Sequence, residues 1–111
     1  MEDSVLQEIH WHDSLILSVH IIPERDRIEM RVLLPESARQ QSYTEETVIF
    51  EEAYGYKEFE GPFAGSPTVL AATVASVNEQ WSLVRLDTNA GYRELWCQDV
   101  YYQARKKRRN A

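Results

Sequence analysis

The sequence predicts an all-β fold, an antiparallel meander that forms either a small barrel or a folded-over sheet, with at most a short helical turn. Three observations support this fold class. Apolar and polar residues alternate along several segments, as they do in half-buried strands. Other segments are rich in β-branched and aromatic residues, and groups of Gly, Pro, Asn and Asp lie between the segments. The 111 residues match the size of one domain, which we expect to cover residues 1–104.

The first two strands are expected at residues 14–22 and 27–34, paired as an antiparallel hairpin. Between them, Pro23-Glu24-Arg25-Asp26 has the chemistry of a turn. Because successive side chains in a strand point to opposite faces, the alternating apolar residues should face the core. These residues are Leu15, Leu17, Val19, Ile28, Met30 and Val32.

The middle of the chain predicts a third strand at residues 47–50, continuing through residues 54–59 after a break near Gly55. Ser66-Pro67 favours one helical turn, because Ser suits the N-cap and Pro suits the first helical position. The β-branched residues that follow favour a strand at about residues 72–77 instead of a long helix.

The last strands are expected at residues 81–87 and 92–102, joined by a turn that contains Asn89 and Gly91. Near the N-terminus, Val5, Leu6 and Ile9 show a helical spacing. Three residues are too few to predict an amphipathic helix.

The charge of the chain favours some partners over others. The net charge is −6, yet five of the 12 basic residues lie in the segment 105–109, so the rest of the chain holds 7 basic and 18 acidic residues. An acidic body repels phosphate backbones and attracts basic proteins, which argues against a nucleic-acid partner. The basic segment 105–111 is expected to be a disordered, solubilising tail.

Cysteine content and hydropathy indicate the compartment. Cys97 is the only cysteine, so an intramolecular disulfide is excluded and a reducing compartment fits. The sequence shows no signal peptide and no apolar run of about 20 residues, the length that spans a bilayer. We therefore expect a cytoplasmic protein that does not insert into a membrane.

His10 and His12 are candidate metal ligands, because side chains at i and i+2 share one side of an extended chain. A metal site needs further ligands, and neither His20 nor Cys97 lies at a spacing that imposes one. We therefore predict no metal and no other cofactor, and interpret His12 and Asp13 as a structural motif at the start of the first strand.

No residue is predicted to be catalytic. Cys97 lies beside Trp96 in an apolar strand, which is typical of a buried cysteine and not of a reactive thiolate. The fingerprints of serine hydrolases, phosphate-binding loops and dinucleotide-binding folds are absent.

An acidic stretch at residues 45–60 holds six glutamates among several aromatic residues. One interpretation is a solvated sheet edge that is protected from pairing with other strands. The other is a recognition surface, on which aromatic rings supply contact area and carboxylates select a basic partner. The candidate partner-binding residues are Glu51, Glu52, Tyr54, Tyr56, Glu58 and Glu60.

The segment from Trp11 to Val19, which contains the pair His12-Asp13, resembles the start of a group of small uncharacterised bacterial β-proteins. In that group a His-Asp pair precedes the first strand of a meandering sheet, and some members are similar to immunity proteins that neutralise polymorphic toxins. The resemblance covers about the first third of the chain, and the basic tail departs from the pattern. It implies a compact β fold and a binding role, with His12 and Asp13 as a structural feature.

The leading hypothesis is therefore a small bacterial binding protein without catalytic activity, with an immunity-type inhibitor as its most specific form. Two alternatives remain open. One is a small metal-dependent hydrolase centred on His10, His12 and Asp13, and the other is a structural subunit that associates with its own copy.

Overall fold

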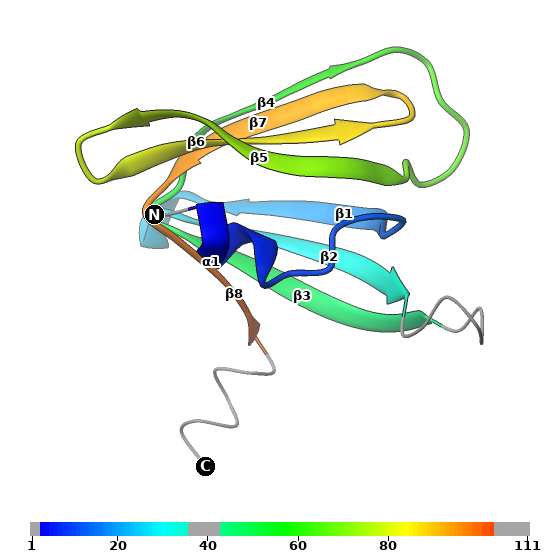
Figure 1. The fold of residues 1–111 in the computed structure, drawn as a ribbon, viewed down its shortest axis with the longest axis horizontal. Coiled ribbons are helices and arrows are strands. Elements are labelled where there is room, and N and C mark those ends of the chain that lie inside the picture. The colour runs from blue at the N-terminus through cyan, green and yellow to red at the C-terminus, as the bar shows by residue number, and fades with distance from the viewer. Residues whose placement is uncertain (1–2, 36–42, 104–111) are drawn as a thin grey trace.

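Two antiparallel sheets of four strands lie one above the other in the computed structural model, which describes residues 3–35 and 43–103 (Figure 1). The first sheet has the strand order β1-β2-β3-β8 and the second the order β4-β7-β6-β5. The elements are α1 (Asp3–Gln7), β1 (Leu15–Ile22), the 3-10 turn η1 (Pro23–Arg25), β2 (Arg27–Pro35), β3 (Tyr43–Glu51), β4 (Tyr54–Glu60), β5 (Val69–Asn78), β6 (Trp81–Thr88), β7 (Gly91–Cys97) and β8 (Asp99–Tyr102). The predicted all-β fold is confirmed, as two facing sheets and not as a closed barrel.

Two strands of each sheet continue directly into the other sheet. β3 pairs with β8 in the first sheet, and their continuations β4 and β7 pair in the second. The crossings are short, residues 52–53 on one side and Gln98 on the other, and both lie at the left of Figure 1. Glu52 takes the left-handed conformation with φ of 49°, and the Gln98 amide donates to the Glu51 carbonyl at 3.0 Å. The sheets are therefore joined by one continuous, sharply bent ribbon.

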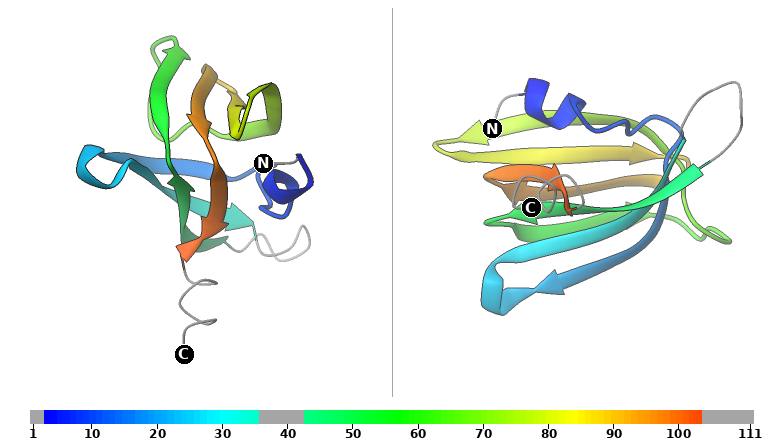
Figure 2. Two further views of the ribbon diagram at one scale, coloured as in Figure 1. Left: turned by 90° about the vertical axis from the view of Figure 1, so that its left-hand side faces the viewer. Right: turned by 90° about the horizontal axis from the view of Figure 1, so that it is seen from below.

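The core lies between the sheets, and α1 closes one open side beside β5 (Figure 2). Leu6 and Trp11, from α1 and the segment after it, are buried in this core. The Trp11 ring stacks on Phe50 with 6.2 Å between ring centroids, and its indole nitrogen donates to the Leu6 carbonyl at 3.2 Å. The Gln7 amide donates to the Ala72 carbonyl at 2.6 Å, which attaches the helix to β5.

The predicted hairpin of β1 and β2 is confirmed, with Ile21 opposite Ile28 and Val19 opposite Met30. The expected core residues of β2 are all buried. In β1 the expectation for Leu15 and Leu17 is wrong, because a bulge falls between Ile16 and Ser18. A bulge inserts one unpaired residue and shifts the alternation. Ile16 is consequently the buried residue at the start of β1, while Leu15 and Leu17 are only partly buried.

The short helix lies at the N-terminus and not at Ser66-Pro67, where one helical turn was expected. Burial of Leu6, with Val5 packed against the core beside it, stabilises a helix that its short periodicity did not predict. β5 starts at Val69, earlier than expected, and the expected strand over residues 92–102 is divided at Gln98. The boundary at residue 104 and the basic tail at residues 105–111 lie outside the described residues.

Candidate functional site

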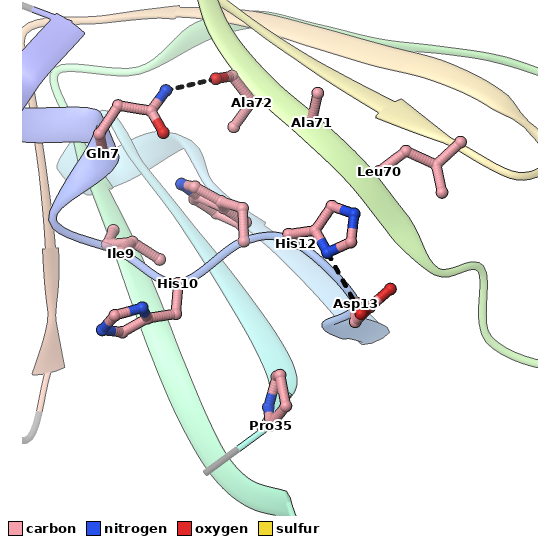
Figure 3. A pocket seen from close by; sticks show the side chains of 10 residues that line it. Gln7, Ile9, His10, His12, Asp13, Pro35, Leu70, Ala71 and Ala72 are labelled. Atoms are coloured by element: carbon pink, nitrogen blue, oxygen red, sulfur yellow. Dashed lines mark hydrogen bonds and ion pairs between the residues drawn. The ribbon is translucent and has the colours of Figure 1, made fainter. Parts of the chain in front are cut away.

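The His12-Asp13 pair borders an open groove of about 720 Å³ between the N-terminal segment and β5 (Figure 3). His12 Nδ1 lies 3.1 Å from Asp13 Oδ2, and both side chains are exposed. The backbone makes the structural connection: the Asp13 amide donates to the Val69 carbonyl at 2.9 Å, and the Val69 amide donates to the Ser14 carbonyl at 2.8 Å. Asp13 takes φ of 68°, a conformation that Asp tolerates better than most residues.

The side chains of His10 and His12 in this groove are not arranged to bind one metal ion together (Figure 3). Figure 3 shows the imidazole rings of His10 and His12 pointing away from each other. Across residues 3–35 and 43–103, no three His, Cys, Asp or Glu side chains come close enough to bind a metal ion. His20 lies exposed on β1, and Cys97 is fully buried in the core. Burial raises the pKa of the Cys97 thiol to about 12, so the thiol stays protonated at neutral pH.

The acidic stretch is divided between β3 of the first sheet and β4 of the second, and several of its carboxylates have arginine partners. Glu51 lies on the outer side of β3, where it accepts hydrogen bonds from Arg27 Nη2 at 3.0 Å and from the Tyr101 hydroxyl. Glu45 pairs with Arg31 Nη2 at 2.9 Å. These basic partners lie on β2, far from the stretch in sequence, so the local excess of acid does not reveal them.

Three further candidates, Tyr56, Glu58 and Glu60, surround Arg93 of β7. Arg93 is buried and holds Glu60 through two hydrogen bonds of 2.9 Å, from Nε and Nη2. Its Nη1 donates to the Tyr56 hydroxyl at 3.1 Å, and that hydroxyl donates to Glu58 at 2.6 Å. The Thr88 hydroxyl donates to Glu60 at 3.0 Å.

This Arg93 network changes the acidity of its members. Burial acts to raise the pKa of Glu60, but the hydrogen bonds from Arg93 and Thr88 lower it below its ordinary value. Burial and the hydrogen bond to Glu58 raise the pKa of Tyr56. Glu60 and Tyr56 therefore bind Arg93 within the protein, whereas the Glu58 side chain is exposed.

Five aromatic rings lie on the outer side of the second sheet, in two groups with Lys57, Glu94 and Arg85 between them. The register of β4, β7 and β6 places Tyr54 beside Trp96 and Phe59 beside Tyr92, on the side opposite the buried residues of β7. The Phe59 and Tyr92 rings stack with 4.7 Å between centroids, and the Arg85 guanidinium carbon lies 3.9 Å from the Tyr92 centroid. We define the aromatic face by its five rings, Tyr54, Phe59, Trp81, Tyr92 and Trp96.

Part of the aromatic face is open to solvent, since Tyr54 is 42% exposed and Phe59 46% exposed. A Cβ atom at Gly91 would collide with the Phe59 carbonyl oxygen, so glycine is needed for β4 to approach β7 at this point. Sequence reasoning identified Tyr54 alone among the five rings. The other four come together only through cross-strand register.

Among the described residues, no helix is long and apolar enough to cross a membrane. No family model matches the chain, and no curated protein matches its sequence significantly. A search of solved structures finds similarity to the crystal structure of an uncharacterized protein from Neisseria gonorrhoeae, with a TM-score of 0.48 and 6% sequence identity, covering 83% of this chain and 91% of that chain.

Proposed function

We propose that this protein is a non-catalytic binding protein that holds a basic protein against the aromatic face. The observation that carries the proposal is the exposed stack of Phe59 on Tyr92, together with the open ring of Tyr54 on the same face. Exposed aromatic rings gathered on one face are typical of interaction sites, because they bury a large apolar area and lose little conformational entropy.

The acidic charge of the chain selects a basic partner. Glu51 and Glu60 are held by Arg27 and Arg93, which largely cancel their charges at a distance, so the long-range field comes from the excess of acidic residues elsewhere in the chain. Glu52 is exposed and directly precedes β4, where it accepts a hydrogen bond from the Tyr54 hydroxyl and can approach a bound basic protein.

An immunity-type inhibitor is the most specific form of this proposal. Such a protein would act in the bacterial cytoplasm, and a single buried Cys97 suits that reducing compartment. A target with a basic active-site surface would be complementary to this site, because it could pack against the aromatic rings and be attracted by the acidic charge.

Binding kinetics with purified candidates test the proposal. Each basic protein encoded beside the gene for this chain would be purified, and its association measured at low and at high salt. We expect association to slow as salt rises. Phe59→Ala and Tyr92→Ala should each speed dissociation about tenfold or more if these rings anchor the partner.

Tyr43→Ala is the matched control, because Tyr43 is a 49% exposed tyrosine on the first sheet. The control should dissociate like the unmodified protein. Binding that survives both Phe59→Ala and Tyr92→Ala unchanged, in variants that circular dichroism shows to be folded, would contradict the proposal.

A further inference from the structure

A small notch lies at one end of the aromatic face. It has a volume of about 230 Å³ and is lined by Tyr54, Asn78, Trp81 and Trp96. The Tyr54 and Trp81 rings meet edge-on, with 6.4 Å between centroids and 62° between planes. Pockets for drug-sized ligands measure about 300 to 1,000 Å³. The notch therefore has room for a single side chain and not for a cofactor.

A bulge in β4 directs Tyr54 to this notch. The pairing of β4 with β7 shifts between Tyr54 and Lys57, and Gly55 within the shift takes φ of 66°. In a regular strand Tyr54 would share a face with Tyr56, which contacts Arg93. The extra residue instead places Tyr54 opposite Trp96. Bulges are frequent beside binding and active sites, where they re-aim a side chain in this way.

Negative charge gathers at the Tyr54 end of the notch. The Tyr54 hydroxyl donates to Glu52 Oε2 at 3.3 Å. Asp26 follows η1, and its carbonyl accepts from the Ala53 amide at 2.7 Å, which fixes this turn beside the start of β4. Desolvation and the carboxylates of Asp26 and Glu52 all act to raise the pKa of Tyr54.

We propose that the notch binds one arginine side chain of the basic partner, an inference that rests on the proposed function. Tyr54, Trp81 and Trp96 supply faces and edges for the flat guanidinium. Glu52, which accepts from the Tyr54 hydroxyl, and Asp26, in the turn bonded to Ala53, supply the opposite charge. Arginine suits the notch better than lysine, because its guanidinium is planar, stacks on rings and is more weakly hydrated. The same face already holds a guanidinium against a ring, at Arg85 and Tyr92.

The test uses N-acetyl-arginine amide as the probe, with tryptophan fluorescence and NMR chemical shifts as readouts. Trp81 and Trp96 line the notch, while Trp11 is buried in the core, so the indole signals separate the notch from the rest of the molecule. We expect saturable binding of the arginine probe and weaker binding of N-acetyl-lysine amide. N-acetyl-citrulline amide, which has nearly the same shape without the charge, should not bind.

Two variants and one control locate the binding. Tyr54→Ala should weaken binding of the probe about tenfold or more. The double variant Asp26→Asn, Glu52→Gln keeps both exposed side chains similar in size and should weaken binding severalfold at low salt. Tyr43→Ala, on the other sheet, should bind the probe as the unmodified chain does. If Tyr54→Ala does not fold, the double variant still decides the question.

Equal binding of the citrulline and arginine probes, or binding that neither variant weakens, would overturn the notch as an arginine site. A different result would contradict the proposed function: a protein partner that binds the folded Phe59→Ala and Tyr92→Ala variants as tightly as it binds the unmodified protein. Because the probe requires no partner, the two failures are distinguishable.

Discussion

Arg93 and Glu60 form a two-bond ion pair between neighbouring strands β7 and β4, with both side chains about nine-tenths buried, at 10% and 11% exposed. The pair secures β4, the edge strand of the second sheet, from beneath the aromatic face. Its strength bears directly on the proposed site, because β4 carries Tyr54 and Phe59.

Glu60→Gln should lower the free energy of unfolding by about 3 kcal/mol, since removing one charge of a buried pair leaves the other uncompensated. Glu58→Gln is the matched control. Glu58 lies 3.5 Å from the same guanidinium but is 47% exposed, and the change should cost less than about 1 kcal/mol. Urea denaturation of the two variants measures both values, and equal losses would show that burial does not strengthen the pair.

Acid should weaken the fold partly through Glu60. Its pKa is lowered in the folded protein from an ordinary value of 4.5, so its contribution to stability is present above that value. The contribution is lost as the pH falls through the folded pKa, because the folded state then takes up the proton. Unfolding measured from pH 7 to pH 2 should show a smaller acid-dependent loss in Glu60→Gln. A curve parallel to that of the unmodified protein would remove Glu60 from the acid response.

The bulge in β1 predicts unequal effects at adjacent residues. Ile16→Ala should cost about 2 to 5 kcal/mol, because Ile16 is 2% exposed and lies in the core. Leu17→Ala should cost about 1 kcal/mol, since Leu17 is the unpaired and only partly buried residue of the bulge. Thermal or urea unfolding distinguishes the two. A larger loss at Leu17 would place that residue in the core instead.

Two tryptophans should respond differently to loss of the indole nitrogen. Trp11→Phe removes a buried hydrogen bond to the Leu6 carbonyl and should cost about 1 to 3 kcal/mol. Within residues 3–35 and 43–103, the buried Trp81 Nε1 has no hydrogen-bond partner, so Trp81→Phe should change stability by less than about 1 kcal/mol. The comparison uses unfolding midpoints, and a costly Trp81→Phe would indicate a partner for that nitrogen.

Alternation along the chain was sufficient to predict the hairpin of β1 and β2, because a half-buried strand repeats every two residues. The bulges after Ile16 and Tyr54 could not be predicted in this way, since each depends on the partner strand and not on the local pattern. The N-terminal helix was missed for a related reason, as its stability comes from burying Leu6 in a core built by distant strands.

The candidate site was predicted only in part. Tyr54 belongs to the aromatic face and Glu52 accepts from its hydroxyl, whereas Glu51 and Glu60 have partners on β2 and β7. A count of local charge cannot reveal pairing across 24 or 33 residues. Trp81, Tyr92 and Trp96 were recognised as strand residues, but their shared face follows from register alone.

The bent ribbon that passes through both sheets also determines how the molecule responds to load. Because β3 runs into β4 and β7 runs into β8, separating the layers at this end would stretch covalent backbone at residues 52–53 and at Gln98. Opening the layers at the other end would break the hydrogen bonds from the Ile16 amide to the Pro67 carbonyl, at 3.0 Å, and from the Val69 amide to the Ser14 carbonyl, at 2.8 Å. Load applied to the second sheet therefore passes through covalent backbone into the first sheet at one end and through hydrogen bonds at the other.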